Sequence, residues 1–242
     1  MPGLADPYLK TARAKEHLSE IQDRLHAFLD SKPITITHED DLENQRHLVR
    51  LNVKDIPEKI ALVVGDFLYC LRSSLDQLLW ALAHTTKPYP RNTQFPILEE
   101  RDDKRINEWT RGVPEAAVAI IKSLQPYTGQ DPTAVGSHLL WRLNLMCNID
   151  KHRRVPTDKN VTITQFPDLP RQHLGLIDYD HDAGIISVPI FLKSSMRSAP
   201  TASLNVIFGD SHEGIECDIK GLEAIYEFVA DAVLPKFLPF FG

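Results

Sequence analysis

The sequence is poor in cysteine, and the few cysteines form no recognisable pattern. Its 242 residues include three, Cys70, Cys147 and Cys217, an odd number with no two close together in the chain. Cys70 and Cys147 fall within apolar helical patterns, where a free thiol behaves as a small hydrophobic side chain. A disulfide framework is therefore not expected, and a reducing compartment fits the cysteine usage.

A long apolar run without charges is also missing. The most apolar stretch, residues 60–83, contains Asp66, Arg72 and Asp76, which makes it a poor membrane span. Residues 1–18 contain no apolar core of the signal-peptide type. We therefore expect a soluble, cytoplasmic protein with no membrane partner.

Basic residues are not in excess, and the common cofactor motifs are absent. The formal net charge is −6 at pH 7, so broad electrostatic binding to nucleic acid is not expected, although the basic run at residues 151–154 leaves a local patch open. The sequence contains no CxxC pair, no histidine pair at zinc spacing, no Walker-type loop and no GxGxxG or GxSxG motif. We expect neither a metal nor a cofactor, and the sequence identifies no partner.

Helical periodicity is the strongest pattern that the sequence does contain. The chain is 43% hydrophobic and 25% charged, an ordinary globular composition that allows a substantial core. Apolar residues recur at helical spacing, and prolines stand at several of the expected helix ends. Helices are expected at about residues 6–31, 57–84, 114–124, 132–154 and 221–233, with a shorter one at 102–111.

Alternating patterns predict strands, mostly in the later part of the chain. An early hairpin is expected from strands at residues 34–37 and 47–53 with a turn at Glu39-Asp40-Asp41. Helices in the middle followed by antiparallel strands are typical of the α+β class. We expect a bundle of about five helices with an antiparallel β-sheet formed mainly by residues after 160. The later strands are expected at residues 161–166, 174–179, 185–192, 204–208 and 215–219.

No linker, charge block or low-complexity tract interrupts the sequence, so we expect a single domain over residues 1–242. Its expected parts are a helical part at about 6–154, antiparallel strands at about 160–219 and a C-terminal helix at about 221–238. The end of the chain is strongly apolar, and it either packs on the core or forms a homo-oligomer contact. The apolar residues there are Phe237, Leu238, Phe240 and Phe241.

Two charged residues interrupt the apolar helix expected at residues 57–84. At about 100° per residue, Arg72 and Asp76 fall outside its polar stripe, on a side that also carries Gly65 and other small residues. Small residues there let another helix approach closely. A buried guanidinium must be paired, and Asp76, one turn away, is the expected partner of Arg72.

A second polar stripe is expected on the helix at residues 132–154. Asn144, Asn148 and His152 follow one another at intervals of four residues and share this side with Trp141. The stripe is therefore expected to point inward, where its members need hydrogen-bond partners. Arg72 and Asp76 are the expected partners.

Two interpretations of these residues stay open. In the first, they form a structural polar cluster that sets the register of two helices. In the second, the cluster lines a cleft in which Arg72, Asn148 and His152 are catalytic candidates, with His152 as the acid or base. The members of the structural cluster would be Arg72, Asp76, Asn144, Asn148, Asp150 and His152.

Several segments carry a resemblance to a known family. RAKEHL, GDFLYCLRSSLDQL, TQFPI, SLQPY and NIDKHR occur in this order between Arg13 and Arg153. This series of segments, which includes LRSSLDQL, resembles an uncharacterised bacterial protein family. The resemblance supports the expected organisation but implies no activity.

A more remote resemblance is to HEPN-like helical proteins, many of which are metal-independent ribonucleases. That resemblance implies an arginine and a histidine four to six residues apart on one helix. Arg142 and His152 are ten residues apart, about 15 Å along a helix, and point in different directions. Asn148 and His152 have a one-turn spacing, but the arginine would have to come from elsewhere, such as Arg72.

The sequence leaves the biochemical function unknown and does not decide whether the protein is an enzyme. The leading hypothesis is a binding or structural module with a buried polar cluster between two helices. The alternative is a HEPN-like metal-independent ribonuclease, or an RNA-binding module of a defence or toxin system. A third hypothesis is a small-molecule pocket between the sheet and the helices.

Overall fold

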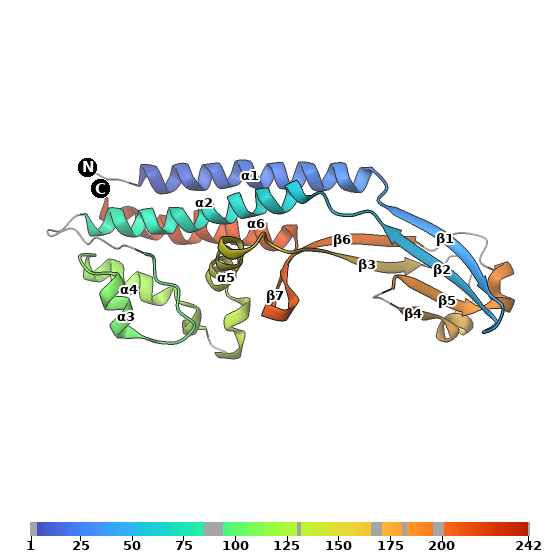
Figure 1. Ribbon diagram of the computed structural model, residues 1–242. Helices are drawn as coiled ribbons and strands as arrows, with labels where there is room; N and C mark the ends of the chain where they lie inside the picture. Colours follow the sequence, from blue (N-terminus) through green and yellow to red (C-terminus); the bar gives the residue numbers. More distant parts are fainter. Residues whose placement is uncertain are drawn as a thin grey trace. The chain divides into compact units, whose positions relative to one another are not determined.

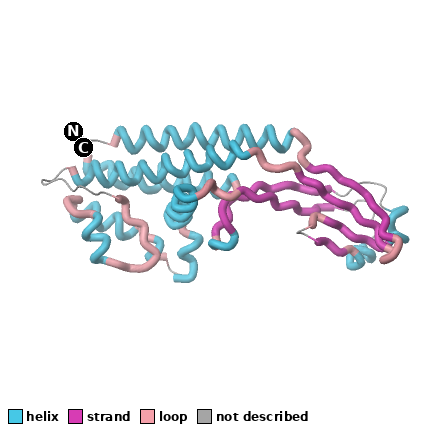
Figure 2. Tube along the Cα trace, in the orientation of Figure 1, coloured by secondary structure: helices cyan, strands magenta, loops and turns pink. Residues whose placement is uncertain are grey.

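The computed structural model describes residues 4–84, 94–129, 132–165, 171–180, 183–195 and 201–241 (Figure 1). The fold is α+β, as predicted, with α-helices and antiparallel strands among the described residues (Figure 2). The chain divides into two compact units, each built from separated segments. The helical unit comprises residues 1–23, 58–157 and 208–242, and the β unit comprises residues 24–57 and 158–207. The single domain expected over residues 1–242 stays a prediction.

The helices lie close to the positions that periodicity predicts. Side-chain caps fix two of the starts, because Asp102 accepts from the backbone N–H of Arg105 and Asp218 accepts from that of Gly221. The helix expected at residues 132–154 begins instead with a 3₁₀ turn, η2, at Pro132–Ser137. The α-helices are α1 (Ala5–Asp30), α2 (Glu58–Ala83), α3 (Asp103–Trp109), α4 (Glu115–Ser123), α5 (Leu139–His152) and α6 (Ile219–Glu227).

Helix α2 forms the core of the helical unit. It is apolar on almost every side, and Phe67, Leu71 and Leu75 are completely buried. Full burial of one such side chain contributes about 1.5–3 kcal/mol. Among the described residues, no helix is both long enough and apolar enough to cross a membrane. All three cysteines are free and buried, and burial raises the pKa of the Cys147 and Cys217 thiols to about 12.

The apolar end of the chain packs partly into the helical unit. Helix α6 continues as a π-helical turn at Phe228–Val233 and a 3₁₀ segment, η7, at Leu234–Phe240. Phe237 is fully buried, whereas Leu238 is 51% exposed. Packing on the core thus accounts for Phe237, and a homo-oligomer contact through this end stays a prediction.

The β unit contains a four-stranded antiparallel sheet in the order β1-β2-β5-β4. Its strands are β1 (Ile34–Asp41), β2 (Arg46–Val53), β5 (Ile185–Pro189) and β4 (Asp178–Asp180). One face carries an apolar core of Val49, Leu51, Ile186 and Val188, against which residues of β3 such as Val161 pack. A second sheet has the order β3-β6-β7, with β3 at Thr157–Gln165, β6 at Thr201–Asp210 and β7 at Ile215–Cys217.

Several strand boundaries differ from those expected. The early hairpin turns at Leu42–Gln45, so the expected turn at Glu39-Asp40-Asp41 is wrong and these residues continue β1. They stay in the strand because Asp40 faces His47 and Glu39 pairs with Arg50 across the hairpin. In the expected strand at 174–179 the chain first forms the 3₁₀ turn η3 (Arg171–Leu176), and only Asp178 and Tyr179 belong to a strand, β4. The strand expected at 185–192 ends at Pro189, before η4 (Ile190–Ser195). Phe166, the expected end of another strand, lies outside the described residues.

Helices α2 and α5 come close together at Gly65. A Cβ atom added at Gly65 would lie 2.4 Å from Oδ1 of Asp150 on α5, so a larger residue here would force this carboxylate to move. Burial raises the pKa of Asp150, and repulsion from Asp66 raises it further. Asp150 therefore lies where the two helices come close together, and its role in setting their register stays a prediction.

We predict that Gly65→Ala and Asp150→Ala are strongly coupled. In the natural chain, Gly65→Ala should lower the free energy of unfolding by about 1–3 kcal/mol through overpacking. In an Asp150→Ala background the clash is gone, and Gly65→Ala should raise stability by up to about 1 kcal/mol because alanine favours the helix. Urea unfolding of all four proteins measures the coupling, and equal effects in both backgrounds would contradict the proposed contact.

Candidate functional site

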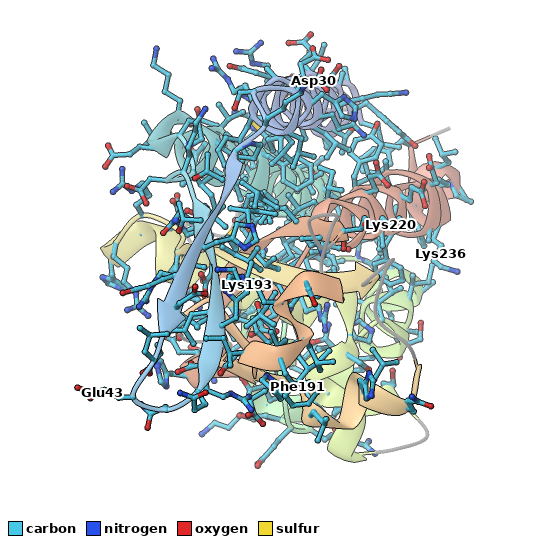
Figure 3. The ribbon with its side chains drawn as sticks, turned by 90° about the vertical axis from the view of Figure 1, so that its right-hand side faces the viewer. Asp30, Glu43, Phe191, Lys193, Lys220 and Lys236 are labelled. Carbon is cyan, nitrogen blue, oxygen red and sulfur yellow. The ribbon has the colours of Figure 1, made fainter. Side chains whose placement is uncertain are left out.

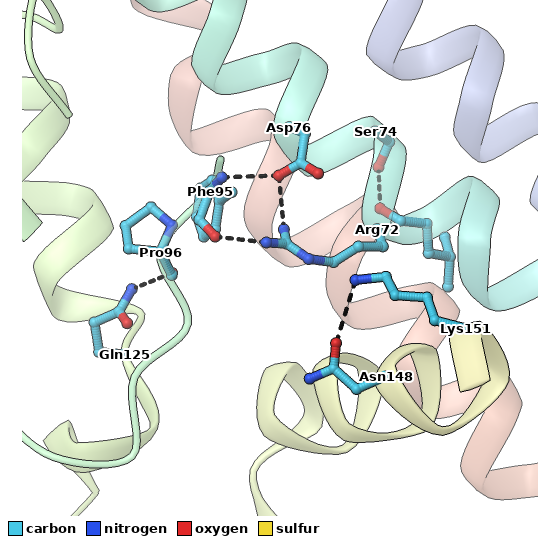
Figure 4. A network of polar contacts seen from close by, with 9 residues as sticks. Arg72, Ser74, Asp76, Phe95, Pro96, Gln125, Asn148 and Lys151 are labelled. Carbon is cyan, nitrogen blue, oxygen red and sulfur yellow. Dashed lines mark hydrogen bonds and ion pairs between the residues drawn. The ribbon is translucent and has the colours of Figure 1, made fainter. Parts of the chain in front are cut away.

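The guanidinium of Arg72 is buried inside the helical unit, where it contacts Asp76 and Phe95. Arg72 is 6% exposed. Its Nη2 donates to the carbonyl oxygen of Phe95 at 2.8 Å, and its Nη1 lies 2.9 Å from Oδ1 of Asp76 (Figure 4). The backbone N–H of Phe95 donates to the same carboxylate oxygen at 2.8 Å. The expected ion pair between Arg72 and Asp76 is confirmed, and it ties α2 to the chain around Phe95.

Opposing effects act on the pKa of the Asp76 carboxyl. Burial raises the pKa of this carboxyl, while Arg72 and the Phe95 N–H act to lower it. A partly buried carboxylate of this kind is tolerated because the guanidinium and the amide both contact its Oδ1 oxygen. These contacts hold the pair against the backbone of Phe95.

Gln125 extends the same network from the end of α4. Its side chain is fully buried, and its amide donates to the carbonyl oxygens of Pro96 and Ile121 at 2.9 and 3.0 Å. Its Oε1 accepts from the backbone N–H of Leu98 at 3.0 Å. Together with the Arg72 contacts, these bonds join the segments LRSSLDQL, TQFPI and SLQPY, of which Thr93 lies outside the described residues. Three of the segments that carry the family resemblance thus hold one another in place.

The structure does not place Asn148 and His152 with Arg72. Both side chains are exposed, whereas Arg72 is buried and contacts Asp76 and Phe95. Asn148 accepts from Lys151 at 3.2 Å (Figure 4). His152 lies in the last turn of α5. Asn144 is only partly buried. The expectation that this stripe points inward is wrong, because α5 buries a different face, formed by Leu140, Leu143, Met146, Cys147 and Ile149.

The basic run at residues 151–154 is largely neutralised within the helical unit. Arg153 forms ion pairs with Asp210 at 2.7 Å and with Glu213 at 2.5 Å. Arg154 lies 3.0 Å from a carboxylate oxygen of Glu58. These partners reduce the positive potential that a phosphate backbone would need.

A cluster that the sequence analysis missed lies on the β hairpin. His47 is 3% exposed, on the same face of β2 as the core residues Val49 and Leu51. Its Nδ1 lies 2.6 Å from Oδ1 of Asp40, and its Nε2 lies 3.1 Å from Nδ1 of His38. The two imidazole rings are stacked with their centroids 5.3 Å apart. Both nitrogens of the buried ring therefore have partners.

Lys193, on η4, completes this cluster, and we call His38, Asp40, His47 and Lys193 the His47 site. The ammonium of Lys193, labelled in Figure 3, donates to Oδ2 of Asp40. Hydrogen bonds from Lys193 and then from His47 are the main causes that lower the pKa of Asp40. The four side chains and Glu39 line a cavity of about 340 Å³. Glu39 is itself paired with Arg50 at 3.1 Å.

The network fixes where the protons lie. An ionised Asp40 can only accept, so Nδ1 of a neutral His47 carries the proton and its Nε2 is an acceptor. His38 must then donate from Nδ1 to His47. The ring nitrogen of His38 that remains for a ligand is Nε2, which carries a lone pair when His38 is neutral.

The His47 site was missed because Asp40 was placed in a turn. With the turn at Leu42–Gln45, the register pairs Asp40 with His47 and His38 with Val49. An acidic residue and a histidine at opposite positions of a hairpin are the available signal, and it depends on the register. Within the part of the chain that the structure describes, no group of three or more His, Cys, Asp or Glu side chains is arranged to hold a metal ion.

No protein-family model matches this chain, and no curated protein or solved structure matches it either. Any functional inference therefore depends on the geometry of the molecule itself. The resemblances to a bacterial family and to HEPN-like proteins stay predictions.

Replacing Arg72 and replacing His152 should have very different effects on stability. Arg72→Met leaves the partly buried Asp76 carboxylate and the Phe95 carbonyl without their partner and should cost up to about 3–5 kcal/mol. His152→Ala removes an exposed side chain and should change stability by less than about 0.5 kcal/mol. Urea unfolding of the two variants checks this, and a loss of similar size in both would show that His152 shares the Arg72 network.

The carboxyl of Asp40 should titrate below 3.8, the ordinary value for aspartate. Since the pKa is lower in the folded protein, Asp40 contributes stability above pH 3.8 that is lost as the pH falls through the native value. Lys193→Met removes the largest cause and should move the titration toward 3.8. Carbon NMR of the carboxyl group measures it. Lys236→Met, at an exposed lysine of the helical unit, is the control and should leave Asp40 unchanged.

Proposed function

We propose that this protein is a binding module that takes up a small anionic ligand at the His47 site. The observation that carries the proposal is the buried His47 ring, held between Asp40 and His38 where they line a cavity with Lys193. Buried polar groups with a specific charge partner beside a cavity are characteristic of ligand sites. A volume of about 340 Å³ is suited to a small molecule.

The balance of donors and acceptors favours an anion. Each carboxylate at the cavity already has a cationic partner, since Asp40 binds Lys193 and Glu39 binds Arg50. The Lys193 ammonium has three N–H donors, and Asp40 uses one of them. Carboxylates, sulfates and phosphates are the ligand groups that accept several charge-assisted hydrogen bonds.

In this proposal the helical unit has a structural role. The contacts of Arg72, Asp76 and Gln125 hold segments of the chain together. A ribonuclease built on Arg72, Asn148 and His152 stays a prediction, and no observation on these residues favours it. Location in the cytoplasm is also part of the proposal, supported by three buried free thiols.

The binding test uses sulfate and acetate as probes, followed by NMR of the histidine ring protons at a slightly acidic pH. Both anions should shift the signals of His38 and His47 with saturation in the millimolar range. Lys193→Met and His38→Ala should each weaken binding by about tenfold or more, the value of one charge-assisted hydrogen bond.

Matched controls exist on exposed positions outside the cavity. His26→Ala removes an exposed histidine from the surface of a helix, and Lys236→Met removes an exposed lysine from the C-terminal segment. Both variants should leave binding unchanged. An absence of saturable shifts at His38 and His47, or equal losses in the control variants, would refute the proposed function.

A further inference from the structure

The His47 site has one feature that goes beyond binding, and it concerns protons. His38 and His47 are joined by a single hydrogen bond between Nδ1 and Nε2, 3.1 Å apart. With both rings neutral, the pair holds one proton on Nδ1 of His47, facing Asp40, and one between the rings. His38 lines the cavity, and its remaining ring nitrogen, Nε2, then carries only a lone pair, which repels an anion.

From this arrangement we infer that the anion binds together with one proton, which His38 takes up at Nε2. The inference rests on the proposed function. The added proton turns Nε2 from an acceptor into a donor, so that His38 adds a hydrogen-bond donor to those of Lys193. The bond to His47 survives, since Nδ1 of a protonated His38 still donates to Nε2 of His47. No bond between the site's residues has to break.

The balance of the surrounding charges also favours the uptake of one proton together with the anion. Two carboxylates of β1 are negative and paired. Glu39 is paired with Arg50 of β2, and Asp40 is paired with Lys193 of η4. These four charges sum to zero, so the site is neutral while both imidazoles are neutral. One added proton gives the site a net charge of +1, which a bound anion neutralises.

Asp40 makes this proton easy to accommodate. When His38 is protonated, the positive charge can be shared with His47 through the connecting hydrogen bond, and Asp40 lies 2.6 Å from Nδ1 of His47. Imidazoles are the side chains that exchange protons near neutral pH. Binding of the anion and binding of the proton therefore favour each other by the same factor.

The test measures the dissociation constant of sulfate by NMR between about pH 5.5 and pH 8.5, the range in which imidazoles ordinarily change charge while sulfate does not. If one proton is taken up, the dissociation constant should rise about tenfold per pH unit at the alkaline end and level off at the acidic end. His38→Gln is the decisive variant, because its amide can donate to the anion without a proton. It should still bind sulfate weakly, with little dependence on pH.

The outcomes separate the two claims. Sulfate binding at the His47 site with a flat pH profile in the natural chain would overturn the proton uptake and leave the proposed function standing. An equally steep profile in His38→Gln would also overturn it, because the proton would then be taken up elsewhere. No sulfate binding at any pH would overturn the proposed function itself. His26→Ala, the control, should reproduce the natural profile.

Discussion

A buried imidazole must find a partner for each of its two ring nitrogens, and the β unit is arranged around this requirement at His47. The ring lies on the inward face of β2, next to Val49 and Leu51, where it cannot bond to water on both sides. Asp40 satisfies one nitrogen and His38 the other. Both partners come from β1, so the strand has to continue past Glu39 before the chain can turn. The same contacts leave Lys193 and His38 at the edge of a cavity, and the proposed chemistry follows from that placement.

The helical unit meets the same kind of constraint with a guanidinium. Arg72 is carried into an apolar core by α2 and must be paired there. Asp76 lies one turn along the helix. The backbone of Phe95 supplies a carbonyl acceptor for Arg72 and an N–H donor for Asp76. Gln125 then binds the neighbouring peptide groups. Arg72 and Asp76, two residues of the polar cluster expected from the sequence, therefore form hydrogen bonds to the backbone of this unit.

Helical and alternating patterns together were enough to predict the α+β class, and helical periodicity predicted the position of α2 and the pairing of Arg72 with Asp76. These depend on residues close in sequence, whose relative directions on a helix are known in advance. The side of α5 that carries Asn148 and His152 was wrongly predicted to be buried. The sequence of one helix does not show which of its faces packs against other parts of the chain.

The His47 site was missed for a related reason. Its pairing depends on the register of a hairpin, and shifting the turn by three residues separates Asp40 from His47.

The central claim is that His47 accepts a hydrogen bond from His38 while donating one to Asp40. Nitrogen NMR of the 15N-labelled protein at neutral pH tests this directly, because an N–H···N hydrogen bond gives a measurable coupling between its two nitrogens. Our account predicts this coupling between Nδ1 of His38 and Nε2 of His47, with the second proton of the pair on Nδ1 of His47. A proton found on Nε2 of His47, with no coupling to His38, would contradict it.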